Sequence, residues 1–342
     1  MTDPVFAQTY CSLAEIDEDS ELFGSEREVK IFEKIQAASN FLEKEIGWFL
    51  PVAMTRKFNG NGRPTLLIPP LLSLSSLVND SVTLSTVNYL LQPDGRHYAN
   101  GPYSEIHAAP GATYGASFIW SSVDNGVEVA GKWGLYDVLK ALGATLGAQQ
   151  AVDALTVQVN NGALVSPGMV LVIGDESEFV ESTNSTPSAA VTTLNGALDA
   201  VSDTLTFTNG ALINIGETMR VDLEQMKLLD RNGNTGYVQR GWNKSRKTNH
   251  LTGANVDVYR TFNVTRAVNG SSAALHTNTS AVSRQMVPGD VKQLTLKIAS
   301  RMLKDSSSGY SGVIGDGMGG NAMYLYVLPK ELEDIKRNYK AW

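Results

Sequence analysis

The sequence has little of what secreted, membrane-bound and metal-dependent proteins usually carry. Its 342 residues include one cysteine, Cys11, which excludes an internal disulfide and a multi-cysteine zinc site. No apolar run approaches the roughly 18 residues that a membrane span needs. The opening Met-Thr-Asp-Pro is not a basic and then apolar signal segment. We therefore expect no membrane contact and no export.

Catalytic motifs are also missing. No histidine pair has HExxH-like spacing, and no serine lies in a Gly-X-Ser-X-Gly elbow. The glycine-rich stretch 315–320 lacks the Lys-Ser/Thr ending of a phosphate-binding loop, so we interpret it as a linker. Residues 230–234 begin like a calcium loop, but Gly241 stands where a bidentate Glu is required. We predict no catalytic, metal-binding or cofactor-binding residue and no cofactor. The scattered histidines are His97, His107, His250 and His276.

The charge balance is acidic, with 28 Lys and Arg against 35 Asp and Glu and a net charge of −7. Such a surface does not attract nucleic acid by bulk electrostatics. One short basic cluster contains Trp242, and two interpretations of it stay open. It contacts a phosphate backbone or an acidic partner, or it is a solvated hairpin tip anchored by the tryptophan, which its shortness favours. The candidate contacts are Arg240, Lys244, Arg246 and Lys247.

Two helices are predicted near the start of the chain, over residues 12–17 and 25–47. Ser12 with Glu15 and Ser25 with Glu28 have the spacing of capping boxes. In the second helix, apolar residues recur at helical spacing and form one stripe, which predicts a face buried in a core or ring contact. The stripe residues are Ile31, Ile35, Leu42 and Ile46.

Two further helices are predicted near the end of the chain, over residues 288–304 and 329–340. The first carries a similar stripe, formed by Val291, Leu294, Ile298 and Met302. Serine and glycine dominate residues 305–321, and we expect no regular structure there. The last helix has Leu332, Ile335 and Tyr339 on one face, with Trp342 just beyond. We interpret it as a tethered contact helix.

The middle of the chain is predicted to be β-rich. Residues 52–134 alternate in the manner of strands, with an apolar run ended by Pro69 and Pro70 and a hairpin turn at 79–81. Residues 136–150 have leucines at helical spacing, so a helix is expected despite two glycines. Residues 155–165 are echoed by 205–213, which predicts two related β modules in tandem.

The order of these motifs resembles the head–tail connector proteins, or adaptors, of long-tailed bacteriophages. The matching stretches cover roughly residues 8–134 and 287–342. They are the small and apolar helix segment 37–42, the Leu-Pro run 66–71, Tyr-Leu-Leu at 89–91, the Val-X-Val-X-Gly-X-Trp-Gly segment 127–134, and Val-Pro at 287–288. In the intervening stretch, Arg240-Gly241 followed by His250, Gly253 and Val256 is similar to a pattern in small β modules of phage neck and tail proteins.

The resemblance implies an α+β fold. Residues 1–135 and 287–342 would form an adaptor core, a small helical bundle with an antiparallel sheet that includes 52–134. Residues 136–286 would be an inserted all-β domain of two related modules.

It also implies a structural role and no catalysis. Such adaptors form a ring, usually of twelve subunits, beneath the portal protein. The ring extends the channel through which double-stranded DNA passes without sequence-specific binding, and it docks a tail terminator, stopper or other neck protein. The expected location is the virion neck at the portal vertex, after assembly in the host cytoplasm. Leu332, Ile335, Tyr339 and Trp342 are the candidate portal or ring contacts. The alternatives are another virion β protein that binds the host surface and, as a third reading, an enzyme.

Overall fold

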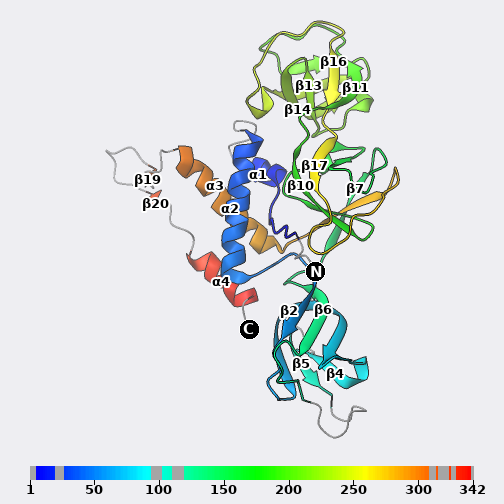
Figure 1. Cartoon of the computed structure of the whole chain (residues 1–342). Helices are drawn as coiled ribbons and strands as arrows, with labels where there is room; N and C mark the ends of the chain where they lie inside the picture. Colours follow the sequence, from blue (N-terminus) through cyan, green and yellow to red (C-terminus); the bar gives the residue numbers. More distant parts are fainter. Residues whose placement is uncertain are drawn as a thin grey trace.

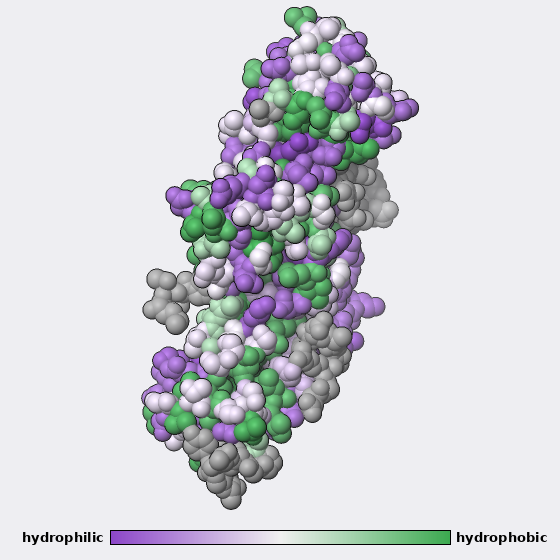
Figure 2. Space-filling view, turned by 90° about the vertical axis from the view of Figure 1, so that its right-hand side faces the viewer, coloured by the Kyte–Doolittle hydropathy of each residue, from purple (hydrophilic) through white to green (hydrophobic). Residues whose placement is uncertain are grey.

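The computed structural model describes residues 5–19, 27–93, 102–109, 119–307, 313–314, 323–324 and 329–339. Mostly antiparallel β-sheets and a few helices make up this part of the chain, arranged in three tiers of an elongated molecule (Figures 1 and 2). The predictions for Ser25, His97, residues 315–320 and Trp342 lie outside the described residues. No helix among the described residues is long and apolar enough to cross a membrane.

Helices from the two ends of the chain pack side by side in the middle tier (Figure 1). The four predicted helices are confirmed with changed bounds: α1 Leu13–Asp19, α2 Glu28–Ile46, α3 Gly289–Ser307 and α4 Pro329–Tyr339. The two predicted stripes meet in one apolar cluster, which Met302 borders. Half of the predicted capping box of α1 forms: the Ser12 N–H donates to Glu15 Oε2 at 2.8 Å, while the Ser12 hydroxyl donates to the same oxygen at 3.0 Å.

The segment after residue 304 is more regular than expected. Helix α3 continues to Ser307, and β19 Val313–Ile314 pairs with β20 Met323–Tyr324. The prediction of no regular structure over 305–321 is therefore wrong at these residues. Glycine and serine lower helix propensity, but they do not prevent an extra helical turn or a short strand pair.

The lower tier in Figure 1 is an antiparallel sheet in the order β1-β6-β2-β5-β4, with β3 paired to β2. Asp80 and Ser81 both have positive φ, which confirms the predicted hairpin turn. The predicted end of the apolar run at Pro69 and Pro70 is wrong, because strand β2 continues through both prolines. The pairing of β2 with β5 shifts register between Leu67 and Leu71. The strands are β1 Val52–Phe58, β2 Thr65–Asn79, β3 Val82–Thr83, β4 Tyr89–Gln92, β5 Tyr103–Ala108 and β6 Val127–Trp133.

This sheet has an apolar core of its own, built around Trp120 and Trp133. The helical bundle instead shares its core with the expected insertion, since Val170 and Val268 belong to the bundle's cluster. The prediction of one core for the bundle and the sheet of 52–134 therefore needs correction. The helices of both ends do pack together, but their sheet partner is mainly the middle of the chain.

Two six-stranded sheets follow, which we call module A and module B. Module A has the order β7-β18-β9-β10-β17-β8, and module B has the order β11-β16-β13-β14-β15-β12. Module A consists of β7 Leu139–Thr145, β8 Thr156–Gln158, β9 Val170–Ile173, β10 Glu176–Thr183, β17 Thr261–Thr265 and β18 Ala281–Gln285. Module B consists of β11 Ser188–Thr193, β12 Thr204–Thr206, β13 Thr218–Val221, β14 Glu224–Asn232, β15 Thr235–Arg240 and β16 Asn255–Val258.

The helix expected over 136–150 is wrong, because this segment forms β7 and pairs with β18. Gly143 adopts a φ of +72°, which a helix does not allow. The leucine spacing fitted both patterns. Cross-strand hydrogen bonds and the two glycines together decide for the strand.

The modules are related residue by residue, but module B is nested in module A instead of following it. Ile173 pairs with Glu176 in module A, and Val221 pairs with Glu224 in module B, an offset of 48 positions. In module B, β14 is followed directly by β15. In module A, the equivalent strands β10 and β17 are separated in the sequence by all of module B. The tandem arrangement predicted from the sequence is thus corrected to an insertion at a hairpin.

Candidate functional site

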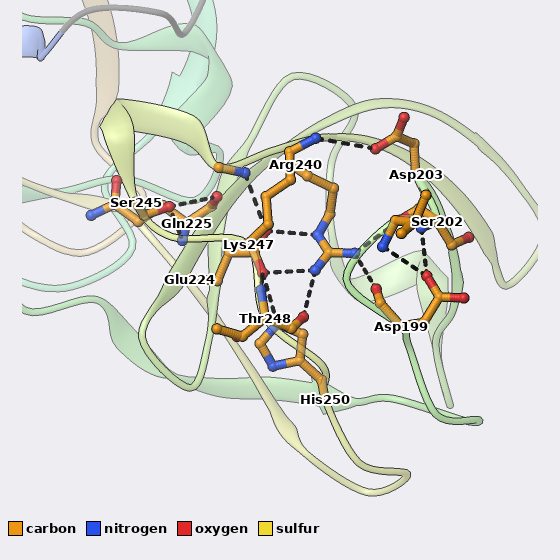
Figure 3. Close-up of polar contacts among 12 residues, drawn as sticks. Asp199, Ser202, Asp203, Glu224, Gln225, Arg240, Ser245, Lys247, Thr248 and His250 are labelled. Atoms are coloured by element: carbon orange, nitrogen blue, oxygen red, sulfur yellow. Dashed lines mark hydrogen bonds and ion pairs between the residues drawn. The ribbon is translucent and has the colours of Figure 1, made fainter.

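Arg240, a predicted partner contact, lies in the interior of module B at the end of β15 (Figure 3). Its side chain is fully buried, and its Nε and Nη2 donate to the two oxygens of Glu224, each at 2.7 Å. The remaining guanidinium hydrogens bind the carbonyls of Asp199, Ser202 and Thr248 at 2.7–2.8 Å. One cation therefore ties together two loops and a strand.

Glu224 is the acceptor at the centre of this network. It also accepts the backbone N–H groups of Gly241 and Thr248, and Nε2 of His250 lies 3.0 Å from its Oε2. Burial raises the pKa of Glu224, but the hydrogen bonds from Arg240, Thr248 and His250 outweigh burial and lower that pKa to about 2. The other ring nitrogen of His250 lies 2.7 Å from Asp222 Oδ2.

The basic cluster therefore does not act as one surface. Arg240 is withdrawn as a DNA or partner contact, because its donors are all used inside the module. Lys244, Arg246 and Lys247 are exposed, and Lys247 lies 3.9 Å from Asp203. Trp242 is buried, with the Lys227 ammonium 4.6 Å from its ring centroid. The tryptophan anchors the segment, as the second sequence interpretation held.

Module A contains the same network, which the sequence analysis missed. Arg266 donates to both oxygens of Glu176 at 2.6–2.7 Å and to the carbonyls of Ala151 and Ala274. His276 Nε2 lies 2.9 Å from Glu176 Oε2. The signal was present in the printed sequence. An Arg, a His ten positions later and a Val six beyond it occur as 240, 250 and 256 and again as 266, 276 and 282.

The two networks differ at two buried positions. Glu178 and Gln150 in module A correspond to Met226 and Leu198 in module B, by the offset of 48. Gln150 donates to Glu178 Oε2 at 3.0 Å, while Oε1 of Glu178 has no hydrogen bond although it lies 3.0 Å from Arg266 Nε. Burial raises the pKa of Glu178, and the neighbouring Glu176 adds to this effect.

One group of side chains in the described part of the chain has a spacing compatible with a metal ion. Ligand atoms of Glu176, Glu178 and His276 lie within 4.8 Å of one another. The residues do not fit a metal, however. Glu176 already accepts four hydrogen bonds from Arg266, Ala267 and Ala274, and His276 Nε2 lies 2.9 Å from its Oε2. The guanidinium of Arg266 already places a positive charge against both carboxylates, 2.6 Å from Glu176 and 3.0 Å from Glu178.

Each module is attached to the rest of the chain by an asparagine with positive φ, and the two asparagines are equivalent. Asn269 in module A accepts the Ala7 N–H at 2.8 Å and donates to the Ala7 carbonyl at 3.1 Å. Its own carbonyl accepts the N–H of Ala53 in β1 at 2.8 Å. Asn243 in module B accepts the Glu28 N–H at 3.1 Å and so caps α2. The network of module A lies beside the junction of module A with the N-terminal segment and the lower sheet.

The candidate contact helix α4 lies against its own subunit. Leu332 and Ile335 are buried in the bundle, and the Tyr339 ring meets Phe49 edge-on at 5.2 Å. Leu332 and Ile335 are therefore corrected from surface contacts to core residues, and Tyr339 is half-buried at the edge of the same cluster. The charged face of α4 remains on the surface, with side-chain exposures of 63% for Glu333 and 78% for Arg337.

Comparison with known proteins finds no matching family model, no matching curated protein and no matching solved structure.

Proposed function

We propose that this chain is a structural adaptor that forms a ring beneath the portal of a tailed phage and docks the next neck protein. The observation that carries the proposal is the body built from both ends of the chain. Helices α2 and α3 are far apart in the sequence but share one apolar cluster, the arrangement implied by the adaptor resemblance. Module A packs against this body, and with the nested module B it extends beyond the helices as an arm (Figure 1).

In a ring of identical subunits, each subunit presents two different faces to its neighbours. The charged face of α4 is the portal-facing candidate, because its apolar face is used within the subunit. Truncation before α4 would expose part of the bundle core and is a poor test. Substitutions on the charged face leave the core intact.

The experiment combines the full chain with the portal protein encoded in the same genome. Mass photometry of the chain alone, and of the mixture, measures ring formation and joining. We expect closed rings and a ring–portal complex, and loss of the complex in Glu333→Lys/Arg337→Glu with the chain still folded. A matched control is the charge swap Lys57→Glu/Glu128→Lys on the lower sheet, which also leaves the net charge unchanged. A chain that remains a monomer at all concentrations, with and without portal, would refute the adaptor function.

A second candidate function, binding to the host surface through module B, is favoured by a separate observation. The highest side-chain exposures among the large apolar residues described are those of Val201 at 84%, Leu223 at 90% and Leu251 at 80%. All three lie in the loops that Arg240 and His250 hold together. Pull-down of the full chain by host envelope, compared with a Val201→Ser/Leu223→Ser/Leu251→Ser variant, tests this function. Equal binding, or none by either, rejects it.

A further inference from the structure

The buried network of module A has one more acidic group than its twin. Glu176, Glu178 and Arg266 are all buried in module A, with exposed side-chain fractions of 0%, 0% and 7%. In module B, Glu224 is the one buried carboxylate that Arg240 pairs with, and Met226 replaces the second acid. Two carboxylates in module A therefore share one guanidinium. Burying an unpaired carboxylate is costly unless a further positive charge balances it.

The groups that face Glu178 limit what this charge can be. They are Glu176 on the same strand, Arg266 after β17, His276 before β18 and the neutral amide of Gln150. A dication would leave the cluster with an excess positive charge and would have to displace donors from Glu176. A single proton balances two carboxylates against one arginine without moving any group.

We propose that Glu178 in module A carries a proton on Oε1, and that loss of this proton loosens the attachment of module A to the N-terminal segment and the lower sheet. Oε1 is the buried oxygen without a hydrogen bond, so a proton can bind there without displacing a donor. Glu176 stays ionised, because its hydrogen bonds from Arg266, Ala274 and His276 outweigh the effect of burial and lower its pKa. The ionised Glu176 beside it favours the protonated form of Glu178, because a nearby like charge disfavours ionisation of a second carboxyl group.

The cluster lies close to the contacts that join module A to the N-terminal segment and the lower sheet. Arg266 is three residues from Asn269, which binds both the N-terminal segment at Ala7 and the lower sheet at Ala53. When Glu178 loses its proton, the two carboxylates repel each other across Arg266. The loops that Arg266 holds then open more readily, and the junction of module A with the N-terminal segment and the lower sheet weakens.

The test is hydrogen exchange of the full chain from pH 5 to 9, with module B as the internal control. Peptides over 148–158 and 264–278 are compared with their equivalents over 196–206 and 238–252, which cancels the intrinsic pH dependence. The ratio of module A to module B exchange should rise by up to about tenfold per pH unit across the titration of Glu178. In Glu178→Gln the ratio should be constant with pH. A wild-type ratio that does not change with pH overturns the proposal.

A second measurement detects the proton directly. At pH 5, the acid end of the titration, the infrared C=O band of a protonated carboxylic acid should lose more intensity in Glu178→Gln than in Glu181→Gln, its exposed neighbour on β10. If Glu178→Gln does not fold, the variant Gln150→Leu/Glu178→Met, which copies module B, replaces it. Calcium, manganese or zinc chloride should not shift the thermal midpoint after chelator treatment. A shift confined to the wild type would identify a cation site and refute the proton.

Discussion

Removing Arg240 tests whether the basic cluster is a structural core element or a contact surface. Arg240→Met keeps the length of the aliphatic stem but deletes the guanidinium. Glu224 then stays buried without its bidentate partner, and the carbonyls of Asp199 and Ser202 lose their donors. Because the Glu224 carboxylate remains, the substitution breaks the ion pair and does not replace both partners with apolar side chains.

The expected magnitude follows from this geometry. Breaking a buried ion pair by removing one partner costs about 3–5 kcal/mol. Both side chains of the pair are 0% exposed, so solvent provides little compensation. The loss should be confined to the opening of module B, since the arginine contacts no residue of module A among its hydrogen bonds. Arg246→Met, six residues along and exposed, should change stability by less than about 0.5 kcal/mol.

Hydrogen exchange by mass spectrometry separates the two modules in one experiment. For Arg240→Met we expect exchange over 238–252 to accelerate on the order of 10²-fold or more, because each 1.4 kcal/mol is tenfold. Exchange over 264–278 should be unchanged. If Arg240→Met and Arg246→Met behave alike, the burial argument is wrong. If both instead reduce binding of DNA fragments equally, the cluster is a contact surface after all.

Three further predictions concern other parts of the molecule. Leu332→Ala should destabilise the bundle by about 2–5 kcal/mol, measured by urea unfolding against Glu333→Ala on the exposed face. Gly270→Ala should weaken the junction of module A with β1, because a Cβ there would lie 1.8 Å from the Ala53 carbonyl oxygen. Its thermal midpoint should be lower than that of Gly62→Ala, where a Cβ would meet no atom within 4 Å. The pKa of Glu224 in the folded chain is about 2, below its ordinary value of 4.5, so ionised Glu224 stabilises the fold. This stabilisation is complete above pH 4.5 and is lost as the pH falls towards 2, so the thermal midpoint of the wild type should drop between pH 5 and 3.

The sequence predicted those elements whose local pattern and tertiary environment agree. The stripe from Ile31 to Ile46 has a single period, and α2 lies almost where it was expected. The turn at Asp80 and Ser81 needs positive φ, which its residue types favour. Residues 136–150 failed because leucines at helical spacing also fit a strand, and only pairing with β18 decides between the two.

The site was less predictable than the fold. Arg240 stood out as a cation in a basic run, but sequence position does not show that Glu224 lies opposite it. Nesting was hidden for a related reason. Strands that pair in module A are separated by all of module B, so the repeat could be detected only in its first half. Comparing the spacing of Arg266 and His276 with that of Arg240 and His250 would have revealed the second half.

Because module B is inserted between two strands of module A, it could be removed as a unit. The chain passes from module A into module B after Thr183 and re-enters module A at Thr261. These two residues are the ends of adjacent antiparallel strands, β10 and β17. In module B itself, the same two strand ends are joined by the short turn around Gly233. Grafting that turn onto module A would close the gap and leave a shorter arm, with loss of the contact between Asn243 and the start of α2. The reach of this molecule can therefore vary while the apolar core of its base is kept.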